Sequence, residues 1–155
     1  MDKIDLRILD LLQKNSALTA GEIGEMVGLS KVPCWRRIQR LQETQVIRQN
    51  VALLDPKSVN VGTTVFVTVK TAAHNAEWFE RFARTVGEIP EVVEVFRMSG
   101  DVDYLLRIVV PDPERYDIVY KKLIAAISFL DVNASFVLET IKSTTALPLH
   151  YAALD

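Results

Sequence analysis

The first fifty residues carry apolar side chains at the spacing of short helices. A first helix is predicted from Asp2, a favourable N-cap residue, to about Asn15. Its apolar positions, three or four residues apart, are Ile4, Ile8, Leu11 and Leu12. A second helix follows the capping box of Thr19 and Glu22, and Gly28 is placed to end it in the left-handed conformation. The apolar face of this second helix is Ile23, Met26 and Val27.

A third helix is predicted from Lys31 to about Thr44, with Ser30 as its N-cap and Pro33 in its first turn. At 100° per residue, one side of this helix gathers Cys34, Ile38 and Leu41, which we expect to face the core. The opposite side gathers Val32, Arg36, Gln39 and Arg40, with Trp35 and Arg37 on the flanks. Two helices joined by a short turn with glycine form a helix-turn-helix. Residues 1–50 are therefore predicted to be a tri-helical, or winged, helix-turn-helix domain.

The outward side of the third helix has the chemistry of nucleic-acid recognition. Arginine and glutamine side chains pair with the edges of guanine and adenine, or with phosphates. Residues 30–48 hold five basic side chains against Glu43 alone, although the whole chain has a net charge of −2. A local basic region on an acidic protein is typical of contact with a polyanion. A solvated helix face, or a module that binds protein, remains an alternative on this pattern alone.

After residue 50 the pattern changes to alternating strands and helices. Residues 46–54 read as a strand-like connector, and residues 51–60 as the linker between domains. Strands are then predicted over four segments, residues 63–71, 92–98, 104–110 and 135–142. Helices are predicted over residues 75–86, with Phe79, Phe82, Ala83 and Val86 inward, and from Asp112 to about Ile127. The order βαββαβ over residues 61–155 predicts a ferredoxin-like domain, and the fold class is α+β.

The strands also carry information about assembly. In this fold both helices cover one face of the antiparallel sheet, so the other face of a monomer should be polar. Leu106, Ile108 and Val110 suffice for the covered face, yet Leu105 and Val109 are apolar as well. Phe66 is likewise opposite to Val65 and Val67. An apolar second face predicts a homodimer, which also suits a helix-turn-helix that reads paired half-sites on DNA.

Several motifs in order resemble one known family. Residues 29–41, LSKVPCWRRIQRL, resemble the recognition-helix signature of the Lrp/AsnC (feast/famine) transcriptional regulators. So do the opening Asp2-x-x-Asp5-x-x-Ile8-Leu9, residues 99–106 (SGDVDYLL) and residues 141–149 (IKSTTALPL). The resemblance covers nearly the whole chain. One departure is Gln45, where the family usually has glycine just past the third helix.

The resemblance implies a sequence-specific DNA-binding regulator that works as an assembly. It implies dimers through the C-terminal sheet, commonly built further into tetramers or octamers. It also implies an amino acid or related metabolite bound between C-terminal domains, which alters assembly or DNA affinity. The operator, the identity of the effector and the direction of regulation are not predicted.

The candidate DNA contacts lie on the third helix and its N-terminus. Arg36 and Gln39 are the expected base readers, whereas Arg40 and Lys31 are expected to position the DNA backbone. The full candidate set is Ser30, Lys31, Val32, Trp35, Arg36, Gln39 and Arg40. Two alternatives stay open: Arg37 is also suited to a structural ion pair, and Trp35 to covering the edge of the core.

The candidate effector site is built on the glycine turn between the second and third strands of the C-terminal domain. A glycine turn exposes backbone amides, and nearby carboxylates suit an ammonium group, so an amino-acid zwitterion finds partners there. The expected residues are Ser99, Gly100, Asp101, Val102, Asp103 and Tyr104. The resemblance adds Asn133 and Ser135, from an opposing loop before the last strand. A plain hairpin turn with solvated aspartates is the alternative.

Other functions find little support in the sequence. The single cysteine, Cys34, is interpreted as core packing and not as a redox sensor, and it favours a reducing compartment. His74 and His150 lack ligand spacing, so no metal site is expected. An enzyme would need a nucleophile, a base and oxyanion donors beside Asp101 and Asp103, and we therefore expect no enzyme. Without a signal peptide or an apolar run of spanning length, we expect a soluble, cytoplasmic protein with no membrane partner.

Overall fold

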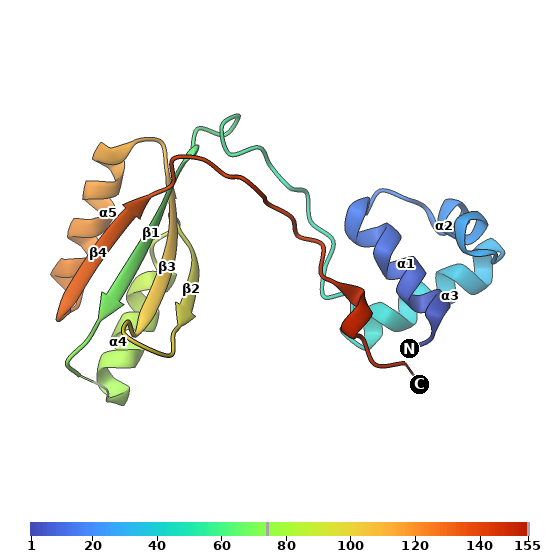
Figure 1. Cartoon of the computed structure of the whole chain (residues 1–155), viewed down its shortest axis with the longest axis horizontal. Coiled ribbons are helices and arrows are strands. Elements are labelled where there is room, and N and C mark those ends of the chain that lie inside the picture. The colour runs from blue at the N-terminus through green and yellow to red at the C-terminus, as the bar shows by residue number, and fades with distance from the viewer. Residues whose placement is uncertain (74, 155) are drawn as a thin grey trace. The chain divides into compact units, whose positions relative to one another are not determined.

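The chain divides into two compact units, and each is described by itself. In this computed structural model, which describes residues 1–73 and 75–154, one unit comprises Met1–Ala52 and Lys142–Asp155. We call it the helical unit. The other comprises Leu53–Ile141 and is called the sheet unit. Figure 1 shows the helices and strands of both.

The helical unit begins with the three predicted helices, α1 (Lys3–Lys14), α2 (Ala20–Val27) and α3 (Lys31–Glu43). The capping boxes of Asp2 on α1 and Thr19 on α2 are both formed, as predicted. Gly28 ends α2 with a φ of 80°, which confirms the left-handed turn. The turn also needs Gly24, because a Cβ there would lie 2.6 Å from the backbone oxygen of Leu29. The tri-helical helix-turn-helix is thereby confirmed.

The core of the helical unit brings together the inward faces of all three helices. Its buried residues are Ile8, Ile23, Val27, Cys34 and Leu41. Cys34 is fully buried, as predicted, and burial raises the pKa of its thiol. Met26 differs from the prediction, since half of its side chain is exposed on α2. Cys34 is therefore a packing residue in this structure.

The sheet unit has the predicted order of elements. They are β1 (Thr63–Lys70), α4 (Ala76–Gly87), β2 (Val92–Arg97), β3 (Tyr104–Val110), α5 (Pro113–Ala126) and β4 (Asp131–Phe136). The strands form one antiparallel sheet in the order β2-β3-β1-β4. Asn75 caps α4 and Asp112 caps α5, each accepting a backbone N–H three residues ahead. This topology confirms the ferredoxin-like fold.

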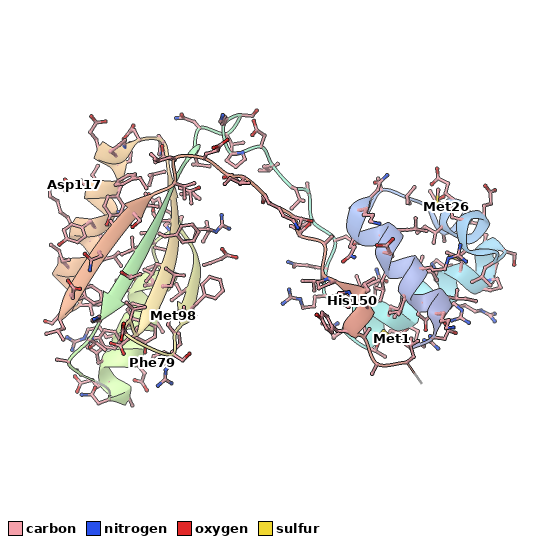
Figure 2. All side chains as sticks on the ribbon, viewed as in Figure 1. Met1, Met26, Phe79, Met98, Asp117 and His150 are labelled. Atoms are coloured by element: carbon pink, nitrogen blue, oxygen red, sulfur yellow. The ribbon has the colours of Figure 1, made fainter. Side chains whose placement is uncertain are left out.

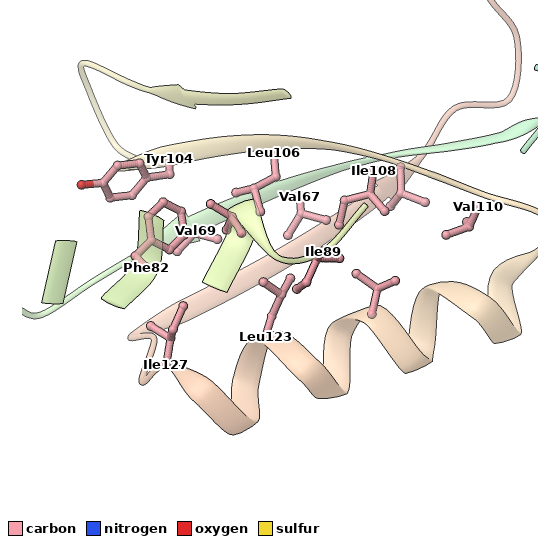
Figure 3. Close-up of a cluster of buried hydrophobic side chains, with 13 residues drawn as sticks. Val67, Val69, Phe82, Ile89, Tyr104, Leu106, Ile108, Val110, Leu123 and Ile127 are labelled. Atoms are coloured by element: carbon pink, nitrogen blue, oxygen red, sulfur yellow. The ribbon is translucent and has the colours of Figure 1, made fainter. Parts of the chain in front are cut away.

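One face of the sheet packs against both helices and forms the larger core. Val65, Val67 and Val69 of β1 are buried there, and so are Leu106, Ile108 and Val110 of β3. Figure 3 shows these side chains between the sheet and the helices. From α4 and α5 the core receives Phe82, Val86, Val119 and Leu123. The alternation of buried and half-exposed residues along β3 follows the period of two that the sequence predicted.

Two predicted strands differ from the structure. Residues 46–54, expected to be a strand-like connector, form no strand and are largely exposed. The last strand, expected over residues 135–142, is Asp131–Phe136. Its bounds are set by pairing with β1, since Asp131 lies opposite Lys70 and Phe136 opposite Val65. The apolar run after residue 135 had shifted the prediction toward the C-terminus.

The C-terminal segment belongs to the helical unit, whereas the sequence analysis had grouped it with the second domain. Lys142–Asp155 clusters with the three helices. Gln13 of α1 donates from Nε2 to the Leu147 carbonyl at 3.1 Å, and the Leu147 N–H donates to Gln13 Oε1 at 2.9 Å. A short 3₁₀ helix, η1 (Leu149–Tyr151), follows. A side-chain amide thus pairs with both backbone groups of one tail residue.

Candidate nucleic-acid interface and ligand site

The outward side of α3 is open in the structure, as the third-helix pattern predicted. Ser30, Lys31, Val32 and Arg36 are exposed, and Trp35 is 52% exposed, so it does not cover the core. Within the described residues, Arg36 forms no ion pair and no hydrogen bond. Ser30 makes no side-chain cap bond at the start of α3. Met26 of α2 adds a further exposed apolar side chain to the helical unit (Figure 2).

Arg37 takes the structural role that had been left open. Its Nη1 lies 2.7 Å from Asp2 Oδ2 and 2.8 Å from Asp5 Oδ1, so the guanidinium joins α3 to the first turn of α1. These two carboxylates raise the pKa of Arg37 further above its ordinary value. Arg37 is therefore committed to holding the helices together.

Asp5 is the centre of this ionic cluster. It is 0% exposed, and Oδ2 accepts the Asp2 N–H at 3.0 Å and the Arg40 Nη2 at 2.6 Å. Burial alone would raise the pKa of Asp5, but the bonds from Asp2 and Arg37 and the charge of Arg40 outweigh it. The pKa therefore lies below the ordinary value of 3.8. Sequence analysis named Asp5 only as part of the opening motif and missed this role.

Two further candidate DNA contacts have partners inside the protein. Arg40 is paired with Asp5 through Nη2, yet 55% of its side chain is exposed. Gln39 is partly buried and donates from Nε2 to Gln42 Oε1 at 3.1 Å. Before any DNA is bound, both side chains are thus already hydrogen-bonded within the protein.

The second face of the sheet carries no helix, and we call it the free face. The strand registers place on it Phe66, Thr68, Glu94, Phe96, Leu105, Arg107, Val109, Asn133 and Ser135. Phe66 and Phe96 are exposed, and Leu105 and Val109 are half-buried. Arg107 pairs with Glu94 across β3 and β2. The free face is mixed: it carries apolar side chains on β1 and β3, as predicted, and also Phe96 on β2.

The turn that was expected to bind an effector connects β2 and β3. Gly100 has a φ of 120°, a conformation that favours glycine. Asp103 is engaged within the protein: its Oδ2 accepts the Thr71 N–H at 2.8 Å, and its N–H donates to the Val69 carbonyl at 2.9 Å. Asp101 is exposed and forms no ion pair within the described residues. Of the two aspartates, Asp101 is the one left for a ligand.

The structure separates the other expected effector residues onto different faces. Tyr104 is buried on the helix side, with ring centroids 4.6 Å from Phe82 and 5.6 Å from Trp78. Asn133 and Ser135 lie within β4, not in a loop, and share the free face, opposite Thr68 and Phe66 respectively. Ser99, Gly100 and Asp101 are exposed and Val102 is half-buried. One chain therefore brings the turn and the start of β4 to the same end of the sheet.

A cleft of about 420 Å³ opens elsewhere in the sheet unit, between α4 and β2. Phe79 and Ala83 of α4, expected in the core, line it together with Val95 and Arg97 of β2. Phe79 and Met98 lie at the same end of this unit (Figure 2). Sequence periodicity placed Phe79 on the inward side of α4, but β2 is an edge strand and leaves that side of the helix partly uncovered.

The described residues give no sign of other chemistry. Among them no group of three or more His, Cys, Asp or Glu side chains is placed to hold a metal ion. His150 lies in η1, and His74 falls outside the described residues. No helix in the described part of the chain has the length and apolar character needed to cross a membrane.

Both units match models of known domains. Residues 1–42 match the AsnC-type helix-turn-helix domain, and residues 64–147 match the Lrp/AsnC ligand binding domain. The chain belongs to the Lrp/AsnC family. Its helical unit is the DNA-binding helix-turn-helix of this family, and its sheet unit is the ligand-binding domain.

Full-length relatives support the family assignment. The chain is 45% identical over 150 residues to the DNA-binding transcriptional activator DecR of Escherichia coli strain K12, covering 96% of this chain and 99% of DecR. It is 44% identical over 149 residues to the glutamate uptake regulatory protein of Zymomonas mobilis, covering 96% and 91%. This Lrp/AsnC protein is thus a transcriptional regulator.

Solved structures of Lrp/AsnC regulators agree with the fold. An AsnC family transcriptional regulator from Agrobacterium tumefaciens has a TM-score of 0.95 and 55% identity, over 99% of this chain and 100% of that one. A transcriptional regulator from Neisseria meningitidis, in complex with L-Met, has a TM-score of 0.92 and 40% identity, over 97% of each chain.

Proposed function

We propose that the open side of α3 reads DNA directly in the major groove. Arg36 and Gln39 contact base edges, and Val32 and Trp35 contact the apolar edges of bases or sugars. Lys31, the Ser30 hydroxyl and Arg40 hold phosphates. The observation that carries the proposal is the exposed, unpaired Arg36 guanidinium, placed on the side of α3 that faces away from the core. The start of α3 adds uncapped backbone N–H groups, which favour an anion.

The proposal is tested with Arg36→Ala and Gln39→Ala against a duplex selected from a random pool by the wild-type protein. Loss of a bidentate base contact weakens binding by about 1–3 kcal/mol and relaxes the preferred sequence. Fluorescence anisotropy measures both effects. Arg84→Ala on exposed α4 removes the same charge elsewhere and serves as the matched control. Unchanged affinity in both α3 variants would show that this helix does not read DNA.

We propose further that the sheet unit binds an amino acid as effector, at the turn from Ser99 to Asp103, between chains of a homodimer or larger assembly. Asp101 then holds the ammonium group, and the backbone at Gly100 and Val102 holds the carboxylate. Asn133 and Ser135 complete the site from a neighbouring chain. The support is the positive φ of Gly100, the unpaired Asp101, the ligand-binding domain and the relative that binds L-Met. Since its proposed target is genomic DNA, we propose that the chain acts in the cytoplasm.

Thermal shift measurements over the twenty amino acids test the effector proposal. A ligand that binds only the folded state raises the unfolding temperature, by more as its concentration exceeds its Kd. Asp101→Asn should abolish the shift, whereas Asp117→Asn on the outer side of α5, already paired with Lys121, should keep it. If no amino acid shifts the wild-type transition, the proposed effector class is wrong.

A further inference from the structure

We infer that Asp5 is a positioning residue for DNA binding, because it fixes the guanidinium of Arg40 beside Arg36 on the recognition helix. This inference rests on the proposed function of α3. Asp5 lies on α1 and is completely buried, so its carboxylate does not contact DNA itself. Its effect on DNA therefore passes through the arginine that it holds.

The contacts of Asp5 divide cleanly between its two oxygens. Oδ1 accepts from Arg37 at 2.8 Å, and Oδ2 accepts from Arg40 at 2.6 Å and from the Asp2 N–H at 3.0 Å. Arg37 is mostly covered and ties the two helices together, whereas Arg40 is mostly exposed. One carboxylate thus anchors a structural arginine on one side and a surface arginine on the other.

The shape of the guanidinium makes this anchoring useful. A guanidinium is a planar fork with five N–H donors, so one edge can hold a carboxylate while another remains open to a phosphate. Arg40 uses a single nitrogen for Asp5, and more than half of its side chain is exposed. An anchored donor loses less conformational entropy when it binds than a free arginine does.

The neighbour of Arg40 gives a second reason for the anchor. Arg36 and Arg40 are four residues apart on one helix, so they lie on the same side and repel each other. The buried charge of Asp5 offsets this repulsion and keeps Arg40 close to the start of α1. Asp5 itself is held ionised, since the capping bond from Asp2 and the two arginines lower its pKa. The capping box of α1 and the cationic side of α3 are therefore one cluster.

Simple charge counting and the positioning role predict opposite effects for Asp5→Asn. If only net charge mattered, removing the negative charge of Asp5 would tighten the binding of DNA. If Asp5 positions Arg40, the variant should instead bind the selected duplex about fivefold or more weakly, because a neutral amide holds the guanidinium less firmly. The plot of log K against log salt should also become shallower by about 0.9 for each phosphate that the variant no longer binds.

A double-mutant cycle with Arg40→Gln separates positioning from folding. Asp5→Asn should weaken binding in the wild-type background and have no further effect when Arg40 is already glutamine. The temperature is set where fluorescence of Trp35 shows every variant folded. An equal loss in both backgrounds, or tighter binding by Asp5→Asn, would overturn the inference.

Arg40→Lys provides a test that keeps Asp5 itself in place. It keeps the charge on an exposed position, but one ammonium group cannot span Asp5 and a phosphate as a fork does. We expect affinity to fall nearly as far as in Arg40→Gln, and wild-type affinity in Arg40→Lys would overturn the inference. If Arg36→Ala and Gln39→Ala also leave DNA binding intact, the proposed function itself fails. If Arg36→Ala weakens binding and the Asp5 variants do not, only the positioning role fails.

Discussion

At the scale of single residues, Gln45 has a strained backbone conformation, and the sequence analysis singled out this position. It stands just past α3, and its φ is 58°. Left-handed backbone brings the Cβ of a non-glycine residue close to the following carbonyl. The Gln45 side chain offsets part of this cost by donating from Nε2 to the Gln42 carbonyl at 3.1 Å. A strained residue is thus retained directly beside the recognition helix.

We predict that Gln45→Gly stabilises the helical unit by about 1 kcal/mol, because glycine adopts positive φ without steric cost. Urea unfolding measures the change, followed by Trp35 fluorescence for the helical unit and by Trp78 fluorescence for the sheet unit, which holds Asn60, each with the other tryptophan replaced by phenylalanine. Asn60, at the same φ of 58°, is the matched control, since asparagine tolerates this region better than glutamine. Asn60→Gly should therefore stabilise the protein less. An equal gain at the two positions would assign the effect to glycine in general and not to Gln45.

At the scale of elements, the first turn of α1 is both a helix cap and an ion-pair site. Asp2 accepts the N–H groups of Ile4 and Asp5, and Asp5 returns a bond to the Asp2 N–H. The bonds from the Asp5 N–H and from Arg37 lower the pKa of Asp2, and the pKa of Asp5 is lowered as well. Carboxyl groups with a lowered folded pKa stabilise the fold above their unfolded pKa. This contribution is lost as the pH falls through the folded values.

We predict that the helical unit loses stability in acid, below about pH 4, where the ordinary pKa of aspartate lies. Asp5→Asn should be less stable at neutral pH and show a shallower fall in acid, because one of the two titrating groups is gone. Urea unfolding across this range, followed by Trp35 fluorescence in a Trp78→Phe background, measures the slope. Equal slopes in the two proteins would exclude Asp5 as a source of the acid sensitivity.

Helices α1 and α3 also show how much of the structure could be predicted from the sequence. Caps, helix bounds and the ferredoxin-like order follow from local patterns, so they were predicted nearly as observed. The ionic cluster joins Asp5 to Arg40 across 35 positions, and no local pattern signals such a contact. The two aspartates of the opening motif and the basic residues of the third helix were the available hints. They did not decide whether Arg37 contacts DNA or forms a structural ion pair.

The position of the strand that carries two expected effector residues was missed for a related reason. Asn133 and Ser135 were placed from the resemblance. Their strand was predicted to start four residues and to end six residues too late, because apolar residues after Phe136 look like strand. The position of β4 is decided by its register with β1, which is a tertiary fact. A site completed by another chain is still less accessible to a single sequence.

At the scale of the whole molecule, the free face of the sheet is the feature that favours association with a second chain. Phe66 is 36% exposed near the middle of β1, with Leu105 and Val109 half-buried on the adjacent strand β3. The cross-sheet pair of Arg107 and Glu94 adds charge that a symmetric partner can match. We therefore propose that dimers form through this face.

We predict that Phe66→Lys converts the dimer to a monomer without unfolding it, because a charge on the free face must be desolvated on association. Size-exclusion chromatography with light scattering measures the mass, and circular dichroism checks the fold. Phe79→Lys on α4 is the matched control, since Phe79 is also an exposed phenylalanine but lies on the helix side. Loss of the dimer in both variants, or in neither, would count against the free face.

The placement of Lys142–Asp155 with the three helices has a consequence for synthesis. The ribosome delivers α1, α2 and α3 first, but the backbone partner of Gln13 at Leu147 comes only after all of Leu53–Ile141 has been made. The unit that emerges first is thus the last to be completed, and a nascent chain arrested at Ile141 carries α3 without the bonds between Gln13 and the tail.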